Sequence, residues 1–373
     1  MTQANLTLRG GAEMVVLKIA QHYKARIYTA EYNKEGTFPE FADLDVEVIG
    51  RKGLALLPYG RVVQGLNYGL SFYNLKLEDD YDVINAHVAP SHWVRNNNER
   101  VLWYCHTPLR DLYDLYQFRM AMKKPYQRPL HMIGLNFVRR IDRKMVSKIE
   151  LILANSKNTR SRIRTYLGRE AKVLNGGIEY KEYANGSDEK YFLYPSRFSP
   201  NKRQLFAIKA FKEFRRMSRP GNYKLVLAGA LSGDRFYSDY YAKVVEEAKK
   251  IKGISVLPNI DDDKLKRLFS HATAVLYPPI NEDYGLTPLQ AMASGKPVIA
   301  VNEGGPKETV VDGKTGFLVN DEKEMAAKMR FIAEHPSTAE EIGRAGIARV
   351  REHYSWDRFF ETFDKALNRV KKM

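Results

Sequence analysis

The sequence predicts two α/β domains, each built around a parallel β-sheet, and three observations support this fold class. The chain has 373 residues, which exceeds what one ordinary hydrophobic core accommodates. In both halves, short apolar runs alternate with segments in which apolar residues recur at helical spacing, a pattern typical of strands joined by crossover helices. A polar stretch with glycine and serine, residues 180–190, separates the halves. We therefore expect domains at residues 1–182 and 190–354, followed by a C-terminal segment at 355–373.

The first half begins with a strand-like run over residues 6–11, which contains Gly10 and Gly11. Apolar residues at helical spacing then predict a helix over 13–22. A glycine pair between a strand and a helix lets a ligand approach the backbone, although a plain tight turn uses the same residues. The other elements expected in this half are strands at 26–30, 46–49, 81–87, 100–105, 151–156 and 172–174 and helices at 66–75 and 157–167.

Two of these strands end in a histidine. His87 closes the strand at 81–87, and His106 directly follows the strand at 100–105. The carboxyl ends of parallel strands meet at one edge of a sheet, where α/β proteins bind ligands. Both histidines are therefore candidate site residues, with a structural role as the alternative for each.

The second half repeats the alternation of strands and helices. Asp261, Asp262 and Asp263 begin one of its helices, so we expect them to cap that helix rather than to bind a metal ion. We find no histidine or cysteine cluster with metal-ligand spacing and expect no metal site. The expected elements of this half are strands at 191–195, 224–228, 254–257, 274–277, 297–301 and 317–319 and helices at 205–217, 237–250, 261–270, 286–294, 322–334, 339–352 and 357–370.

Two places in the second half carry groups suited to phosphate. Arg197 and Lys202 share one loop after a strand and can hold a pyrophosphate with one forked and one point cation. Gly285, Leu286 and Thr287 open a helix, where free backbone N–H groups and the helix dipole favour an anion.

Two further polar residues flank the start of that helix. Glu282 lies in the loop before it, and Gln290 lies inside it. A carboxylate accepts hydrogen bonds from sugar hydroxyls, and the neighbouring groups suit phosphate. The second half is therefore predicted to bind a nucleoside diphosphate that carries a polyol.

The overall charge favours an anionic partner. Lysine and arginine number 60 against 44 acidic residues, a net charge of +16, which suits nucleic acid, anionic lipid or phosphorylated small molecules, or simply a soluble surface. We find no helix-turn-helix, zinc-finger or aromatic RNA-binding signature, so nucleic acid is not expected. The single cysteine, Cys105, excludes an internal disulfide. With no signal peptide or membrane span evident, the expected location is the cytoplasm.

One segment of the first half is both basic and apolar. Residues 110–148 contain ten cations, three carboxylates and many interleaved aromatic and aliphatic side chains. This combination suits contact with an anionic membrane surface. A pair of ordinary helices with solvated basic faces is the alternative, and the prolines at 125 and 129 interrupt any clean amphipathic stripe. Peripheral binding on the cytosolic face of a membrane therefore stays open beside a purely cytoplasmic location.

The stretch NEDYGLTPLQAMASGKPVIA, residues 281–300, resembles the signature of glycosyltransferase family 4, retaining enzymes with the GT-B fold. The resemblance covers almost the whole chain. It implies two Rossmann-like domains that face a cleft, the first binding the acceptor and the second the nucleotide-sugar donor. It also implies that the C-terminal helix crosses back to pack on the first domain.

The resemblance assigns roles to the candidate residues. It implies that the glycine pair Gly10-Gly11 follows the first strand and that His87 lies by the reacting carbon. Arg197 and Lys202 match the pair that holds the donor pyrophosphate, and Glu282 matches the residue that contacts the donor sugar. The catalytic residues that the resemblance implies are His87, Glu282, Arg197 and Lys202. The residues implied to bind the donor also include Gly10, Gly11, Gly285, Leu286, Thr287 and Gln290. His106 and Arg110 are implied to lie on the acceptor side.

One position departs from the family pattern. The second glutamate of the signature is Gln290 here, where the family residue typically hydrogen-bonds the nucleotide ribose. Glutamine keeps a carbonyl acceptor and loses the charge. A charged hydrogen bond is worth about 1 kcal/mol more than a neutral one, so we expect weaker donor binding rather than lost chemistry.

The stretch over residues 103–110, WYCHTPLR, looks most like mannosyltransferases of lipid-linked or surface glycan assembly. The resemblance therefore implies GDP-mannose as the favoured donor, a UDP-sugar as the second choice, and a glycan or polyprenyl-phosphate-linked acceptor. It implies no required cofactor or metal. Two alternatives from other classes stay open: an epimerase of the same fold, and a non-catalytic nucleotide-sugar-binding homologue.

Overall fold

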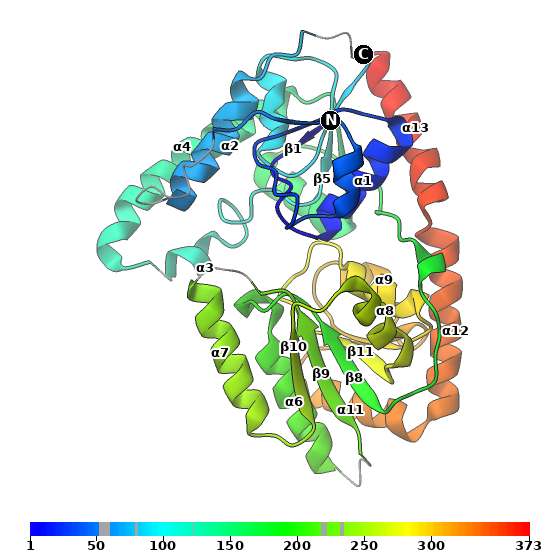
Figure 1. The fold of residues 1–373 in the computed structure, drawn as a ribbon. Coiled ribbons are helices and arrows are strands. Elements are labelled where there is room, and N and C mark those ends of the chain that lie inside the picture. Colours follow the sequence, from blue (N-terminus) through cyan, green and yellow to red (C-terminus); the bar gives the residue numbers. More distant parts are fainter. Residues whose placement is uncertain (52–59, 79–80, 122, 218–221, 232–234) are drawn as a thin grey trace. The chain divides into compact units, whose positions relative to one another are not determined.

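The structure is a computed structural model that describes residues 1–51, 60–78, 81–121, 123–217, 222–231 and 235–373 (Figure 1). The chain divides into two compact units. Unit 1 comprises residues 1–176 and 359–373, and unit 2 comprises residues 177–358. Each unit contains one parallel β-sheet, so the predicted fold class is confirmed.

The sheet of unit 1 has seven strands in the order β3-β2-β1-β4-β5-β6-β7. Every neighbouring pair is parallel. All residues of β4, β5 and β6 are buried, as expected for central strands covered on both faces. The strands are β1 Thr2–Gln3, β2 Ile27–Thr29, β3 Val46–Val48, β4 Ile84–Ala86, β5 Val101–Cys105, β6 Leu151–Ala154 and β7 Lys172–Val173.

The helices of unit 1 connect these strands and cover the sheet. The α-helices are α1 Gly11–Tyr23, α2 Gly60–Asn74, α3 Tyr116–Ala121, α4 Arg128–Lys148 and α5 Lys157–Arg162. Short 3₁₀ helices form at Pro39–Asp43, Ser91–Asn96 and Pro125–Gln127, and a π-helical turn at Ile163–Leu167 extends α5.

The C-terminal helix α13, Trp356–Lys371, belongs to unit 1 from residue 359 onward. Its residue Phe363 is fully buried, and Asp364 accepts a hydrogen bond of 2.6 Å from the hydroxyl of Tyr23. Phe360 stacks on His22 with ring centroids 3.8 Å apart. The helix that ends the chain is therefore part of the first domain's core, as the resemblance implied.

The start of the chain differs from the expectation. The strand β1 is Thr2–Gln3, not residues 6–11, and Leu6 forms only an isolated bridge with Tyr32. Leu6 is nevertheless fully buried, so its apolar character reflects core packing beyond the end of β1 and β2. The strand and the glycine pair are consequently separated by several residues.

The sheet of unit 2 has six parallel strands in the order β10-β9-β8-β11-β12-β13. The strands are β8 Tyr191–Pro195, β9 Lys224–Gly229, β10 Ile254–Pro258, β11 Ala274–Tyr277, β12 Val298–Val301 and β13 Gly316–Val319. The helices are α6 Gln204–Met217, α7 Arg235–Lys249, α8 Asp262–His271, α9 Leu286–Ala293, α10 Pro306–Thr309, α11 Glu322–Glu334 and α12 Pro336–His353.

The acidic run at the start of α8 acts as a helix cap. The side chain of Asp261 accepts a 2.7 Å hydrogen bond from the backbone N–H of Lys264. This satisfies one of the free donors of the first turn, and the carboxylates that follow suit the positive end of the helix dipole. Across the described part of the chain, no group of three or more histidine, cysteine or acidic residues is placed to hold a metal ion. Within the same part, no helix is long and apolar enough to cross a membrane.

Candidate functional site

The strand order of unit 2 reverses between β8 and β11, and the carboxyl ends of these strands form the topological switch point, or crevice, of the sheet. These strands are neighbours, but β8 connects through α6 to β9 on one side and β11 connects through α9 to β12 on the other. Such a reversal of strand order is where open α/β sheets bind ligands. The loops that follow β8 and β11 contain Arg197, Lys202 and Glu282, so the predicted donor residues flank this point.

The structure brings two of these residues into contact. The ammonium group of Lys202 forms an ion pair with Glu282, across 80 positions of sequence. Their side chains are only 14% and 15% exposed, so solvent screens this pair less than one on the open surface. Opposite charges at the crevice can therefore offer a cation to phosphate and an acceptor to hydroxyl groups.

The loop after β8 is held by side chains from the strand before it and the helix after it. The hydroxyl of Tyr194 donates to the carbonyl of Lys202, and the Gln204 side chain donates to the carbonyl of Arg197 at 2.8 Å. The Arg197 side chain is exposed. Among the described residues no hydrogen bond or ion pair involves its guanidinium group, which is consequently available to an anion.

The loop after β11 is held by a second glycine pair, Gly304-Gly305. The N–H of Gly305 donates to the carbonyl of Glu282 at 2.8 Å. Gly304 has φ 60, and a Cβ atom there would collide with the Glu282 backbone. Only glycine fits this conformation and this close approach without strain. The pair therefore fixes the backbone that carries the candidate carboxylate.

A further ion pair near the crevice was not predicted from the sequence. Arg203 contacts Glu303 at 2.9 Å, and Glu303 also accepts a 3.0 Å hydrogen bond from the N–H of Asn281. Three loops, after β8, β11 and β12, are joined through this one carboxylate. The available signal was the position of Glu303 just after a buried strand and before two glycines.

The helix α9 begins at the crevice with Gly285 as its N-cap. Gly285 has φ 88, and a Cβ atom there would lie 3.2 Å from the ring of Tyr277. No side chain caps this end, and Pro288 has no N–H group. The backbone N–H groups of Leu286 and Thr287 are thus the donors that the first turn can present to an anion.

Gln290 already has a protein partner. Its side-chain NH2 donates to the hydroxyl of Tyr183 at 2.9 Å. Burial raises the pKa of that hydroxyl to about 12, so the tyrosine stays neutral. This contact leaves the amide oxygen of Gln290 as the atom that can accept a hydrogen bond from a ligand. The sequence predicts only a polar linker around Tyr183, so this contact becomes visible only in the folded chain.

In unit 1 the two predicted histidines meet at the ends of β4 and β5, which are neighbours in the sheet. Nδ1 of His87 lies 3.2 Å from Nε2 of His106, and Nε2 of His87 lies 2.6 Å from the side-chain oxygen of Asn85. Burial, together with the nearby His106, lowers the pKa of His87 well below its usual value. Burial lowers the pKa of His106 to about 3. Both imidazoles are therefore neutral at neutral pH.

The contacts also determine which nitrogen carries each proton. The Asn85 NH2 group donates to the carbonyl of Leu102, so its oxygen accepts from Nε2–H of His87. Nδ1 of His87 then has a lone pair and accepts from Nε2–H of His106. Both nitrogens of His87 are occupied inside unit 1, while Nδ1 of His106 keeps a lone pair.

Arg110 lies on the loop that follows His106. It donates to Asp114 at 2.8 and 3.0 Å, and Arg162 approaches the same carboxylate oxygen at 3.3 Å. Arg162 also contacts the hydroxyl of Thr107. Two guanidinium groups thus contact one carboxylate oxygen next to the loop that follows His106.

The glycine pair of unit 1 forms the start of a helix. Gly10 is the N-cap of α1 and Gly11 its first residue. A Cβ atom on Gly10 would collide with the carboxylate of Glu13, which is itself buried in the first turn. A carboxyl group of the protein therefore already lies at this helix end, where the sequence predicted that a ligand could approach the backbone.

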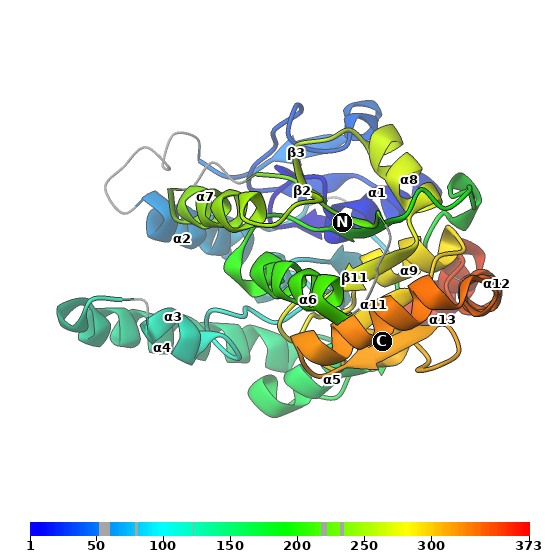
Figure 2. The same ribbon diagram turned by 90° about the horizontal axis from the view of Figure 1, so that it is seen from below.

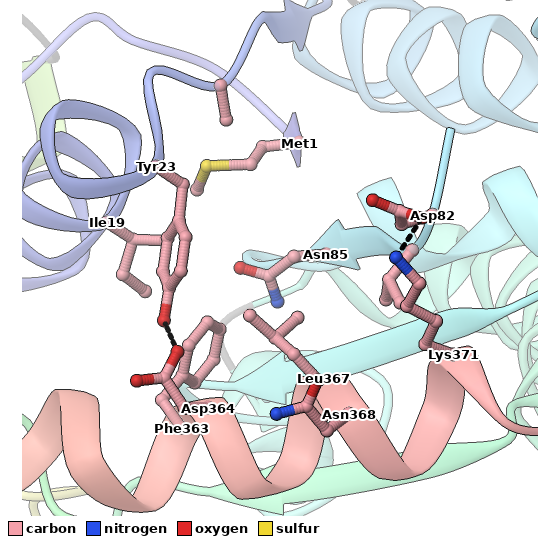
Figure 3. A pocket seen from close by; sticks show the side chains of 12 residues that line it. Met1, Ile19, Tyr23, Asp82, Asn85, Phe363, Asp364, Leu367, Asn368 and Lys371 are labelled. Carbon is pink, nitrogen blue, oxygen red and sulfur yellow. Dashed lines mark hydrogen bonds and ion pairs between the residues drawn. The ribbon is translucent and has the colours of Figure 1, made fainter. Parts of the chain in front are cut away.

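Unit 1 also contains a cavity of about 390 Å³, shown in Figure 3. It lies between α1, β4 and α13 and is lined by Tyr23, Asn85 and Phe363 among others. Its charged groups are paired, Asp82 with Lys371 at 2.6 Å and Asp364 with the hydroxyl of Tyr23. None of the predicted site residues lines it, so it is not assigned to the candidate site.

Comparison with known proteins agrees with the signature. Residues 9–182 match the Glycosyltransferase Family 4 model, and residues 178–349 match the Glycosyl transferases group 1 model. The α-1,3/1,6-mannosyltransferase ALG2 of Mus musculus is 30% identical over 394 aligned positions, which cover 94% of this chain and 91% of the relative. The chain is a family 4 glycosyltransferase. As an enzyme of this family it depends on a nucleotide sugar.

One further relative and two solved structures are similar to this glycosyltransferase. ALG2 of Dictyostelium discoideum is 26% identical, with 97% of this chain and 95% of the relative covered. The HepE protein of Anabaena, solved with UDP and glucose, has a TM-score of 0.75 at 17% identity and covers 98% of both chains. Sucrose-phosphate synthase from Thermosynechococcus elongatus has a TM-score of 0.77 at 19% identity, with 98% and 96% covered. These two structures share the fold.

Proposed function

We propose that this glycosyltransferase moves mannose from GDP-mannose to a glycan or polyprenyl-phosphate-linked acceptor, with retention at the anomeric carbon. The observation that carries the choice of mannose is the similarity to the mannosyltransferase ALG2 along nearly its whole length. Unit 2 is the proposed donor half and unit 1 the proposed acceptor half. A UDP-sugar is the second choice of donor.

In the proposed donor half, charge is placed for the leaving diphosphate. Arg197 and Lys202 neutralise the negative charge that develops as the bond from C1 of the sugar to the phosphate oxygen breaks. Glu282 accepts hydrogen bonds from sugar hydroxyls. Its ion pair with Lys202 supports this arrangement, because it places the ammonium group before the donor arrives and lowers the cost of ordering it.

The start of α9 and Gln290 complete the proposed donor half. The N–H groups at Gly285, Leu286 and Thr287 face the phosphates, and the amide oxygen of Gln290 accepts from a ribose hydroxyl. The contact between the Gln290 NH2 group and Tyr183 supports this orientation. Because glutamine is neutral, this hydrogen bond stabilises the bound donor by about 1 kcal/mol less than a hydrogen bond to a glutamate would.

In the proposed acceptor half, His106 presents the lone pair of Nδ1 to a hydroxyl group. His87 orients His106 through the hydrogen bond between their rings, so the role that we propose for His87 is to position His106. Arg110 supplies positive charge to a phosphate-bearing acceptor. The glycine pair Gly10-Gly11 is proposed to keep the backbone clear for the donor, although Glu13 already occupies the helix end.

The proposed chemistry is a front-face substitution. The acceptor oxygen forms its bond to C1 on the face from which the nucleoside diphosphate leaves, and the acceptor proton passes to the leaving phosphate oxygen. Neutral His106 is suited to orient the acceptor hydroxyl and not to remove its proton at neutral pH, given its lowered pKa. The protein contributes position and charge stabilisation.

A panel of nucleotide sugars tests this proposal in two steps. Thermal shift with GDP-mannose and with UDP- and GDP-linked alternatives identifies the donor, and labelled transfer to a polyprenyl-phosphate-linked glycan acceptor follows. We expect the largest shift and the transfer with GDP-mannose. A shift with UDP-sugars alone overturns the choice of donor. Isomerised sugar without an acceptor indicates an epimerase, and binding without transfer over many acceptors indicates a binding protein.

A further inference from the structure

The helix α4 is anchored to unit 1 by one face of its C-terminal half. Met145 and Val146 are fully buried, and Leu135 and Val138 pack against the core of this unit. Asp142 is buried as well and accepts hydrogen bonds from three buried side chains, those of His92, Trp93 and Tyr113. The inner face of the helix is therefore accounted for by the core.

The outward-facing side of residues 126–137 is also apolar. Leu130, Ile133 and Phe137 are 78%, 66% and 63% exposed, and their spacings of three and four residues place them on one side of α4. Tyr126, which is 74% exposed, lies in the 3₁₀ helix just before α4. Figures 1 and 2 show that this end of α4 extends away from the sheet of unit 1. Single exposed apolar residues are ordinary, but a continuous apolar stripe marks an interaction site.

Cations surround and continue this stripe. Lys123 and Lys124 precede it, and Arg140 and Lys144 extend it at the same helical spacing. All four are exposed, and within the described residues none of their side chains makes an ion pair. Residues 123–148 contain eight lysines and arginines and a single acidic residue, the buried Asp142.

We propose that this outer face of residues 123–144, the α4 stripe, binds the surface of an anionic lipid bilayer. The four apolar side chains enter the boundary between headgroups and acyl chains, and the cations contact lipid phosphates. The inference rests on the proposed function in one respect, since a polyprenyl-linked acceptor lies in such a bilayer. The α4 stripe then brings unit 1, the proposed acceptor half, to the acceptor.

Charge decides between a bilayer and a second copy of the chain. Pairing two stripes across a two-fold axis would bring two clusters of cations together, and like charges in contact are unfavourable. An anionic bilayer instead complements both the cations and the apolar side chains. A nucleic acid would complement the cations but would leave Leu130 and Ile133 without an apolar environment.

Flotation of the full chain with vesicles tests the proposal. One vesicle is phosphatidylcholine alone, and the other is phosphatidylcholine mixed with phosphatidylglycerol. We expect binding to the anionic vesicle. The triple variant Leu130→Ser, Ile133→Ser, Phe137→Ser is expected to lower the partition coefficient by about a thousandfold, because each buried apolar side chain contributes roughly a factor of ten.

Charge is tested separately. Lys123→Gln with Lys124→Gln is expected to weaken binding to the anionic vesicle by about thirtyfold, with no effect on phosphatidylcholine, at ~1 kcal/mol for each cation. The matched control is Val48→Ser, which removes an apolar residue that is 39% exposed on the edge strand β3 of unit 1. It should float like the unmodified protein.

The outcomes separate this inference from the proposed function. Unchanged flotation of the triple variant overturns the α4 stripe as a docking surface. The α4 stripe as a lipid-docking surface is also overturned if sedimentation without lipid shows a dimer of the unmodified protein and a monomer of the triple variant. Loss of flotation with transfer to a water-soluble acceptor intact supports the stripe. Flotation that depends on the stripe in a protein that uses no donor would overturn the proposed function and leave the stripe standing.

Discussion

The two candidate half-sites use different physics, although both lie at the carboxyl ends of neighbouring strands in a parallel sheet. In unit 2 the loops after β8 and β11 meet through ionised groups, Lys202 with Glu282 and Arg203 with Glu303. In unit 1 the ends of β4 and β5 meet through two buried neutral imidazoles, His87 and His106. Paired charges suit a diphosphate, whose charge changes in the reaction. Neutral donors and acceptors suit a hydroxyl group that must be oriented without being ionised.

The largest effect should come from the cations of unit 2. Arg197→Ala and Lys202→Ala are each expected to lower kcat/KM for the donor by two or more orders of magnitude, about 3 kcal/mol of transition-state stabilisation. Steady-state transfer with GDP-mannose measures this. The control Lys209→Ala removes an exposed cation of α6 whose partner is Glu322 and should leave the rate unchanged. Equal effects of all three substitutions would show that Arg197 and Lys202 act only through the overall surface charge and not at a donor site.

The second effect concerns pH and the neutral histidines of unit 1. The folded-state pKa of His106 is lowered from 6.5 to about 3, so below pH 6.5 the unfolded state binds a proton that the folded state does not. The free energy of unfolding should therefore fall as pH decreases from 6.5 towards 3, by up to about 1.4 kcal/mol per pH unit from this residue.

Urea unfolding at a series of pH values measures this dependence. The variant His106→Gln lacks the titrating group, so its free energy of unfolding should fall less steeply below pH 6.5 than that of the unmodified protein. A control variant, His335→Gln, changes an exposed histidine of unit 2 and should keep the full slope. An identical slope in His106→Gln would mean that the imidazole is not held neutral.

A smaller effect is expected at the one departure from the signature. Gln290→Glu restores a charged acceptor and should tighten donor binding by up to about tenfold, the equivalent of roughly 1 kcal/mol. Tyr183→Phe removes the partner of the Gln290 amide and should raise the donor KM with kcat unchanged. Calorimetry measures donor binding by Gln290→Glu, and steady-state kinetics measure KM and kcat of Tyr183→Phe. Weaker binding by Gln290→Glu would show that glutamine is required as a donor there.

The smallest effect should come from the ion pair behind the crevice. Glu303→Gln keeps the shape and weakens the contact with Arg203, so we expect donor affinity to fall only about threefold, as for a partly exposed pair. A double-mutant cycle with Arg203→Gln, read by donor affinity, measures the coupling. Additive losses would show that the two residues act on the loops independently.

The backbone of both halves was largely predictable because the information for it is local. The apolar run at residues 274–277 and the helical spacing from Leu286 reappear as β11 and α9. The prediction of a strand at residues 6–11 was wrong, because Leu6 is buried by the fold around it and not by the hydrogen-bonded ladder of a strand. Apolar spacing alone cannot separate these two causes.

The sequence by itself determined the alternation of strands and helices, the loops that carry Arg197 and Glu282, and the family signature. These depend on periodicity and on residue types within short windows. Only the tertiary structure decided which side chains meet, since contacts such as Lys202 with Glu282 and His87 with His106 require the strand order. It also decided that Gln290 faces Tyr183, and that α4 is apolar on two sides. The sequence shows that α4 has many apolar residues, but only packing separates the face that the core covers from the face that it leaves to solvent.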